Sequence, residues 1–247
     1  MTDVLLDIQE LSKRFHGVVA SDAISLAVRQ GELHALIGPN GAGKTTLIGQ
    51  LAGEIVADSG SISFAGRDVT ALPIYRRSAL GLARTFQITS LFPEFTALDN
   101  VALAVQAHAG HSYRFWRDAR YDPTLRVPAQ EALAQVGLQG RADALASNLS
   151  HGEHRQLEIA MALATRPRMV LLDEPLAGMG SNESRRMVAM LRELKRGLTI
   201  LLVEHDLDAV FELADQITVL VEGRVIASGA PAEIRANAEV KIAYLGE

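Results

Sequence analysis

A glycine-rich segment early in the chain carries the residue types that bind phosphate. Residues 38–46 read GPNGAGKTT and contain the pattern G-x-x-x-x-G-K-T, between an expected strand and an expected helix. Glycines let the backbone bend so that successive N–H groups face phosphate oxygens, and the helix N-terminus adds partial positive charge. Lys44 is predicted to lie beside the β- and γ-phosphates and Thr45 to bind Mg²⁺. The predicted nucleotide-binding set is Asn40, Gly41, Ala42, Gly43, Lys44, Thr45 and Thr46.

Two acidic residues follow an apolar run in the last third of the chain. The segment MVLLDEP (169–175) predicts a buried strand from which Asp173 emerges, at the strand end where α/β sheets bind ligands. Asp173 is predicted to hold Mg²⁺ through water, and Glu174 to accept a proton from an attacking water. On its own, a buried strand followed by a solvated turn explains this pattern equally well. The phosphate loop upstream favours the functional interpretation.

A histidine ends the next apolar segment, TILLVEH (199–205). An imidazole at that position can hydrogen-bond a terminal phosphate and orient a water molecule. A single histidine at a strand end is more often simply solvated, so His205 gains weight only from the motifs around it.

The order of these motifs resembles that of the ABC (ATP-binding cassette) ATPase family. Between the phosphate loop and LLDEP lies LSHGEHRQLEIA (149–160), where the family carries its LSGGQ signature. The resemblance implies ATP as the nucleotide and a head-to-tail dimer, because in the family the signature helix faces the γ-phosphate held by the opposite subunit. Ser150, Gly152 and Glu153 are the residues carried over to that role.

Further positions match the family one at a time. The resemblance implies that Phe15 stacks on adenine with Val18 or Val19 beside it, and that Gln87, in RTFQ, touches Mg²⁺ and the lytic water. The catalytic set is then Lys44, Gln87, Glu174 and His205, and the metal set is Thr45, Gln87 and Asp173. His151 replaces a signature glycine and Gly180 replaces a usual aspartate, which leaves the coupling between subunits open. An H-x-x-H metal site at His151 and His154 is disfavoured, because no further ligand is evident.

Strand and helix patterns alternate at both ends of the chain and become mostly helical in the middle. LHALIG (33–38) and the two later apolar runs predict a parallel sheet, and the hairpin at Glu222 and Gly223 predicts antiparallel pairing. The fold class is α/β, a P-loop NTPase of the ABC type with a mainly parallel core sheet, an antiparallel β layer and an inserted helical subdomain. We expect one domain over residues 1–247, with the helical subdomain at about 88–165. Residues 109–128 are interpreted as a surface connection, and residues 181–197 as a helix closed by Gly197.

The composition restricts the cell compartments and the kinds of partner that are expected for this chain. The chain has no cysteine, a formal net charge of −5 and no apolar run near the ~20 residues that span a bilayer. Its N-terminus lacks the positive charge of a signal peptide. With the resemblance to the ABC family, these features imply a cytoplasmic protein, peripheral on the cytoplasmic face of the inner or plasma membrane. The resemblance implies that it binds transmembrane permease subunits there and works with a second ATP-binding subunit, identical or related. A solute-binding protein takes part indirectly, and nucleic acid is not expected to bind.

Three features resemble the ATP-binding subunits of branched-chain amino-acid importers: RTFQ, EP-x-AG after the acidic pair, and the tail EIRANAEVKIAYLGE. Urea and amide importers share them, and lipopolysaccharide exporters share the style of the tail. The apolar residues expected to contact the permease, or else to pack in the core, are Leu91, Phe92, Phe95 and Leu98. A chromosome-structure ATPase is disfavoured because no long heptad repeat interrupts the chain. A P-loop kinase leaves the signature unexplained, and an ATP-binding subunit without catalysis stays open because of Gly180.

Overall fold

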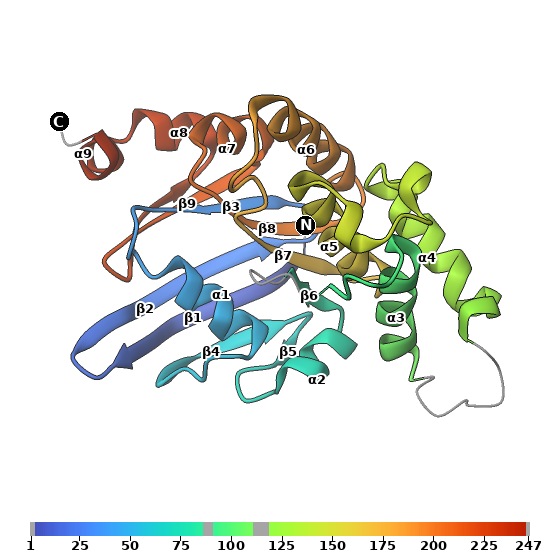
Figure 1. The fold of residues 1–247 in the computed structure, drawn as a ribbon. Helices are drawn as coiled ribbons and strands as arrows, with labels where there is room; N and C mark the ends of the chain where they lie inside the picture. Colours follow the sequence, from blue (N-terminus) through green and yellow to red (C-terminus); the bar gives the residue numbers. More distant parts are fainter. Residues whose placement is uncertain (1–2, 86–90, 111–118, 246–247) are drawn as a thin grey trace.

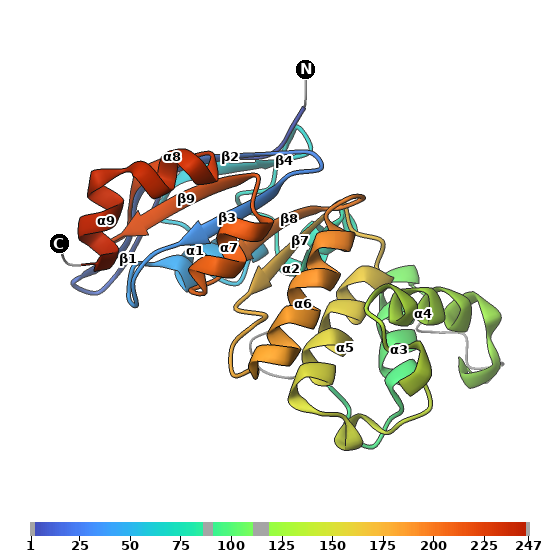
Figure 2. The same ribbon diagram turned by 90° about the horizontal axis from the view of Figure 1, so that it is seen from above.

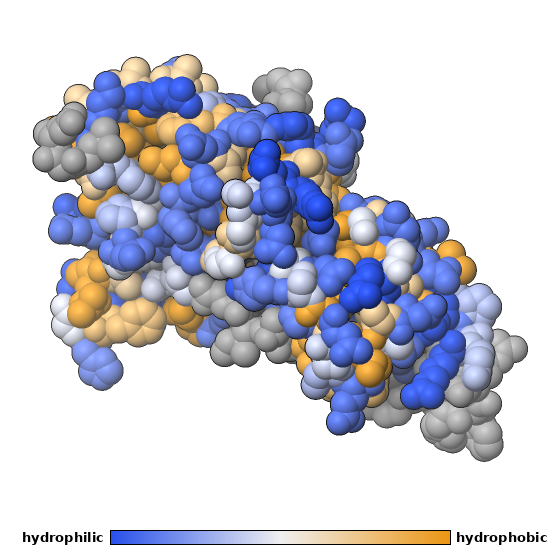
Figure 3. Space-filling model, turned by 45° about the horizontal axis from the view of Figure 1, so that its top comes forward, coloured by the Kyte–Doolittle hydropathy of each residue, from blue (hydrophilic) through white to orange (hydrophobic). Residues whose placement is uncertain are grey.

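The computed structural model describes residues 3–85, 91–110 and 119–245. Two sheets and two groups of helices make up the molecule, as Figure 1 shows. Among the described residues, no helix is both long enough and apolar enough to cross a membrane. The face drawn in Figure 3 is mostly hydrophilic, and its hydrophobic atoms lie in separate patches.

The central sheet has six strands in the order β10-β9-β3-β8-β7-β6. All neighbours pair in parallel except β9 and β10, which form an antiparallel hairpin. Its strands are β3 (Leu33–Ile37), β6 (Leu82–Arg84), β7 (Met169–Asp173), β8 (Thr199–Val203), β9 (Gln216–Val221) and β10 (Arg224–Gly229). Because parallel strands share one carboxyl edge, the segments that follow β3, β7 and β8 meet there. This arrangement confirms the mainly parallel sheet predicted from the sequence.

The second sheet has four antiparallel strands in the order β2-β1-β4-β5. They are β1 (Val4–Phe15), β2 (Val18–Arg29), β4 (Ser59–Phe64) and β5 (Arg67–Asp68). Helix α1 (Lys44–Ala52) lies between the two sheets, and its apolar side chains share one core with both of them. The antiparallel β layer expected from the sequence is therefore present, and it encloses the helix that follows the phosphate loop.

Helices on the opposite face of the central sheet complete the sandwich (Figure 1). These are α6 (Ser181–Leu194), α7 (Leu207–Leu213), α8 (Pro231–Ala236) and α9 (Ala238–Leu245). A second group of helices lies to one side, best seen from above in Figure 2. It contains α3 (Ala97–Ala109), α4 (Pro123–Gln135) and α5 (His151–Ala164), and the short helix α2 (Ile74–Ala79) lies between this group and the four-stranded sheet.

Local signals explain where most elements begin and end. The Thr96 side chain accepts a hydrogen bond from the N–H of Asp99 at 3.0 Å and so caps the start of α3. The hairpin turn between β9 and β10 places both Glu222 and Gly223 at positive φ, as a two-residue hairpin requires.

Two boundary predictions were wrong. α4 begins at Pro123, inside the stretch interpreted as a surface connection, with Asp122 as its N-cap. α6 ends at Leu194, three residues before the expected Gly197, and the intervening residues form a turn. For α4, packing overrides the local signal, because this helix contains an internal proline and is held between α3 and α5.

Candidate nucleotide-binding and catalytic site

The loop between β3 and α1 is shaped by glycines that no other residue could replace without strain. Gly41 and Gly43 have φ angles of 79° and 99°, and a Cβ on Gly43 would lie 2.1 Å from the carbonyl oxygen of Ala20. A Cβ on Gly38 would lie equally close to the carbonyl oxygen of Leu220. α1 has no side-chain cap at Gly43. The first N–H groups of this helix are therefore open to an anion such as a phosphate.

Lys44 is folded back onto this loop. Its Nζ donates to the carbonyl oxygens of Gly38 and Pro39 at 2.6 and 3.0 Å, and the residue is 7% exposed. Burial lowers the pKa of Lys44, while the charges of Glu174 and Asp173 raise it. The lysine, the predicted metal-binding residue Asp173, the predicted catalytic residue Glu174 and the loop therefore form one cluster. Asn40, Gly41 and Thr45 are exposed at its rim, Ala42 is buried and Thr46 is half-buried.

Asp173 ends β7 as a buried carboxylate with an unused oxygen. Its Oδ2 accepts from Nη2 of Arg84 at 3.1 Å, whereas Oδ1 has no hydrogen-bond partner among the described residues. Burial raises the pKa of Asp173, and the neighbouring guanidinium of Arg84 opposes that rise. A buried acceptor without a partner fits a hydrogen bond from a metal-bound water. Together with the exposed Thr45 at the start of α1, this donor set suits Mg²⁺.

Glu174 follows in a conformation that ordinary residues seldom adopt. Its φ angle is 50°, and its N–H donates to the carbonyl oxygen of Val203 at 2.9 Å. Positive φ at a non-glycine residue is a form of local strain that recurs at functional sites. The bond to Val203 fixes Glu174 beside the end of β8, and the charge of its half-buried side chain acts on Lys44 in the loop.

Glu204 organises the end of β8 beside the predicted catalytic histidine. Its fully buried carboxylate accepts from the N–H groups of Leu176 and His205 at 2.8 and 3.1 Å. Burial raises the pKa of Glu204, and these hydrogen bonds lower it. The side chain of His205 is 60% exposed at the carboxyl edge of the sheet, and its Nδ1 lies 3.8 Å from Oε2 of Glu204.

The two residues expected to hold adenine lie together at the β1–β2 turn. Phe15 and Val18 are paired across the hairpin and are 42% and 67% exposed. Nζ of Lys13 lies 5.4 Å from the centre of the Phe15 ring. The same strand β2 reaches the phosphate loop at Ala20, which touches Gly43. An exposed apolar pair next to a phosphate loop is a suitable platform for a base.

The signature segment forms the start of α5. Ser150 and Glu153 make a reciprocal capping box, with bonds of 3.2 Å and 2.8 Å between each side chain and the other's backbone N–H. Ser150 is exposed, whereas Gly152 is buried against Glu183 of α6. These two glutamates keep the start of α5 fixed against its surroundings.

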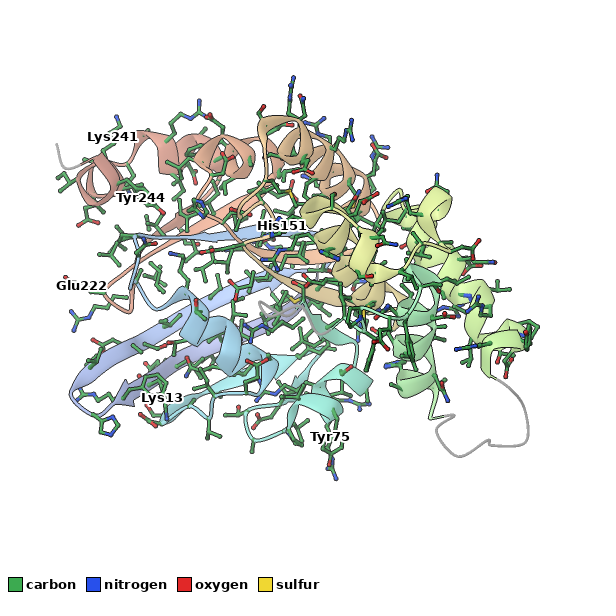
Figure 4. All side chains as sticks on the ribbon, viewed as in Figure 1. Lys13, Tyr75, His151, Glu222, Lys241 and Tyr244 are labelled. Carbon is green, nitrogen blue, oxygen red and sulfur yellow. The ribbon has the colours of Figure 1, made fainter. Side chains whose placement is uncertain are left out.

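His151 points from α5 toward the segment after β7 (Figure 4), and a Cβ on Gly178 would lie 3.3 Å from its Cε1. Nε2 of His154 instead bonds the carbonyl oxygen of Ala146 at 2.6 Å. The two histidines therefore have separate neighbours. Gly180 is exposed at the start of α6.

A cavity of about 460 Å³ opens beside the catalytic cluster, between α2, α3, α5 and β6. Its wall includes Tyr75, labelled on α2 in Figure 4, and Leu91. Phe92 and Phe95 are 52% and 38% exposed and lie 5.3 Å apart between ring centres, whereas Leu98 is buried in the core. Gln87 lies outside the described residues.

Sequence reasoning missed two charged residues of this site, Arg84 and Glu204. A signal existed for both, because each is a charged residue within or directly after a buried apolar strand, where a partner is required. The identity of those partners depends on which strands are neighbours, and that is a property of the fold.

Comparison with known proteins defines the class to which this fold and site belong. The family model described as ABC transporter matches residues 21–177, and a model described as branched-chain amino acid ATP-binding cassette transporter matches residues 224–247. The chain belongs to the ABC transporter ATP-binding family, whose members hydrolyse ATP to power transport.

Individual members of that family are similar to this chain over nearly its whole length. It is 38% identical, over the whole of both chains, to the high-affinity branched-chain amino acid transport ATP-binding protein LivG of Salmonella typhimurium. It is 34% identical to the lipopolysaccharide export system ATP-binding protein LptB of Acidithiobacillus ferridurans, over 98% of this chain and 97% of the relative. The structure matches the ADP conformation of MJ1267, an ATP-binding cassette of an ABC transporter, with a TM-score of 0.88 and 30% identity over all of both chains.

Proposed function

We propose that this chain is the ATP-hydrolysing subunit of an ABC importer for branched-chain or other hydrophobic amino acids. The main observation in support of this cargo is the match of residues 224–247 to the branched-chain amino acid transporter model. Full-length similarity to LivG supports the same cargo. A urea or amide importer and a lipopolysaccharide-type exporter are the alternatives that the experiment below separates.

The proposed working unit contains two ATP-binding subunits, two transmembrane permease subunits and a solute-binding protein that delivers the cargo. The chain reaches the cytoplasmic face of the membrane through the permease. The segment around 88–165 acts as the helical subdomain, and the cavity beside β6 receives a short permease helix. Its mostly apolar wall and the exposed Phe92 and Phe95 next to it support this docking role.

The chemistry follows from the cluster at the carboxyl edge of the central sheet. The loop N–H groups and Lys44 bind the phosphates, Glu174 accepts the proton of the attacking water, and His205 donates to the γ-phosphate. Thr45, Asp173 and Gln87 would hold Mg²⁺, which would supply charge neutralisation at the phosphates. Ser150 and Gly152 of the partner subunit close the site from the other side, so hydrolysis and dimer opening are linked.

The test is ATP-dependent uptake by the assembled transporter. The tagged chain is purified from its native membranes with its permease partners and reconstituted in liposomes with the solute-binding protein. We expect uptake of labelled leucine, isoleucine and valine. Uptake of urea alone, or movement of lipopolysaccharide outward, would replace the cargo proposed here.

Two variants test the assigned roles in the same preparation. Glu174→Gln should bind ATP and dimerise but lose turnover, since only the proton acceptor is removed. Lys44→Ala should lose nucleotide affinity. Normal turnover in the first variant, or unchanged affinity in the second, would contradict the role given to that residue.

A further inference from the structure

Arg84 connects two carboxylates that belong to different parts of the molecule. From the end of β6 it donates through Nη2 to Asp173 at 3.1 Å, and through Nη1 to Glu54, just after α1. Its side chain is 10% exposed, compared with 1% for Asp173 and 34% for Glu54. One guanidinium is therefore shared between a buried acid at the catalytic edge and a more exposed acid outside it.

The contact with Asp173 leaves polar groups unused. Oδ1 of Asp173 and Nε of Arg84 have no hydrogen-bond partner in the part of the chain that the structure describes, although both atoms are buried. A buried carboxylate needs a nearby cation. Lys44 is not bonded to Asp173, since its ammonium group is held by two loop carbonyls. Arg84 is thus the cation that directly compensates Asp173 in this structure.

We propose that Arg84 is a positioning residue that supplies the charge facing Asp173 when no metal is bound, and that the guanidinium leaves Asp173 and stays bonded to Glu54 when Mg²⁺ binds. The inference rests on the proposed role of Asp173 as a metal ligand. Two cations close to one carboxylate repel each other, so the metal and the Arg84–Asp173 contact oppose one another. A second acceptor at Glu54 lowers the cost of moving the arginine, because the guanidinium keeps one carboxylate partner.

Asp173, Arg84 and Glu54 form an ion triad that lies between the catalytic cluster and the cavity. Arg84 and Glu54 also line the 460 Å³ cavity, whereas Asp173 belongs to the catalytic cluster. The triad therefore crosses the wall between the two sites. A group that enters the cavity and binds Glu54 changes how strongly Arg84 holds Asp173, which links cavity occupancy to metal binding.

A purely structural ion pair between β6 and the end of α1 is the competing explanation, and it makes a different prediction. Loss of such a pair lowers stability equally with and without metal. Loss of the proposed compensating charge changes the metal requirement instead, and substitutions of Arg84 and of its second partner Glu54 change it in opposite directions.

The experiment measures thermal unfolding of the full chain with saturating ADP, in EDTA and along a Mg²⁺ titration. Arg84→Met should lower the Mg²⁺ concentration for half-maximal stabilisation at least about fivefold, and Glu54→Gln should raise it by a similar factor. Arg84→Lys keeps the charge, so its Mg²⁺ concentration for half-maximal stabilisation should stay close to that of the unsubstituted protein. Arg192→Met and Glu212→Gln, which break an exposed ion pair between α6 and α7, are the matched controls and should not move it.

The outcomes separate this inference from the proposed function. An unchanged or raised Mg²⁺ requirement in Arg84→Met, or a shift in the same direction for Glu54→Gln, overturns the inference. If Arg84→Met does not fold, the shift in Mg²⁺ requirement of Glu54→Gln alone tests the inference. Glu54 is partly exposed, so this variant is expected to fold. Asp173→Asn should abolish the Mg²⁺ response; a normal response in that variant shows that the metal role of Asp173 itself is wrong.

Discussion

Arg77 is a buried arginine whose hydrogen bonds all go to backbone carbonyls. It is 3% exposed and donates to Gln50 and Leu51 at the end of α1 at 2.6 and 2.7 Å. Further bonds of 2.8 and 2.9 Å reach the carbonyls of Leu72 and Thr70. The last carbonyls of a helix lack partners within the helix, so Arg77 closes the end of the helix that begins at the phosphate loop.

Replacing Arg77 by methionine keeps much of the side-chain volume but removes all four bonds. At about 1.5–3 kcal/mol for each bond to a charged group, the simple sum is an upper limit, because water reaches part of the gap and neighbouring bonds are not additive. We expect a loss of about 3–5 kcal/mol in the free energy of unfolding, the range for breaking a buried charged network. That is a large fraction of the total stability of an ordinary domain.

Urea unfolding followed by circular dichroism measures this loss. The control is Arg76→Met, since Arg76 is the exposed neighbour on the same helix and should change stability by less than about 0.5 kcal/mol. Arg77→Lys should fall between the two, because one ammonium cannot reach all four carbonyls. A loss below about 1 kcal/mol for Arg77→Met would refute the argument that these bonds hold α1 in place.

Three further predictions concern glycines and one tyrosine. Gly43→Ala should weaken binding of a fluorescent ATP analogue by at least about tenfold, because the new Cβ collides with a backbone carbonyl; Gly197→Ala, where nothing lies within 4 Å, is the control. Gly178→Ala should cost about 1–2 kcal/mol in urea unfolding, since φ is +75° and the Cβ approaches the His151 ring; a neutral change would mean that the backbone relaxes. Burial raises the pKa of Tyr244 to about 12, against about 10 in an unfolded chain, so the unfolded state ionises first and stability falls from pH 10 to 12. Tyr244→Phe should therefore show a shallower decline in that window and a constant offset below it, and parallel curves throughout would contradict the raised pKa.

The site illustrates which kinds of residue a sequence can reveal. The phosphate loop was predictable because its glycines and Lys44 act within a few residues of one another. Asp173 was placed correctly at the end of β7, and His205 two residues beyond the end of β8, because a continuous apolar run predicts each strand. Arg84 and Glu204 were missed because their partners lie 89 and 28 residues away.

The helical region was less predictable than the sheets. The capping residue Thr96 marks the start of α3 in the sequence. In contrast, α4 contains Pro128 and has only a weak apolar face. Its helical form depends on packing of Leu125 and Leu133 into the core shared with α3 and α5. Leu98, offered as a permease contact or a core residue, proved to be core for the same reason.

The sequence alone determined the chemistry, because phosphate binding, strand ends and capping depend on residue types a short distance apart in the chain. It determined the α/β class as well, since alternating apolar patterns fix which segments become strands and helices. Only the tertiary structure decided that Arg84 is shared between Asp173 and Glu54, that His151 faces Gly178 and that a cavity lies beside the catalytic edge. Those features depend on the order of strands in the sheet and on helix packing, which bring together residues that local patterns leave unconnected.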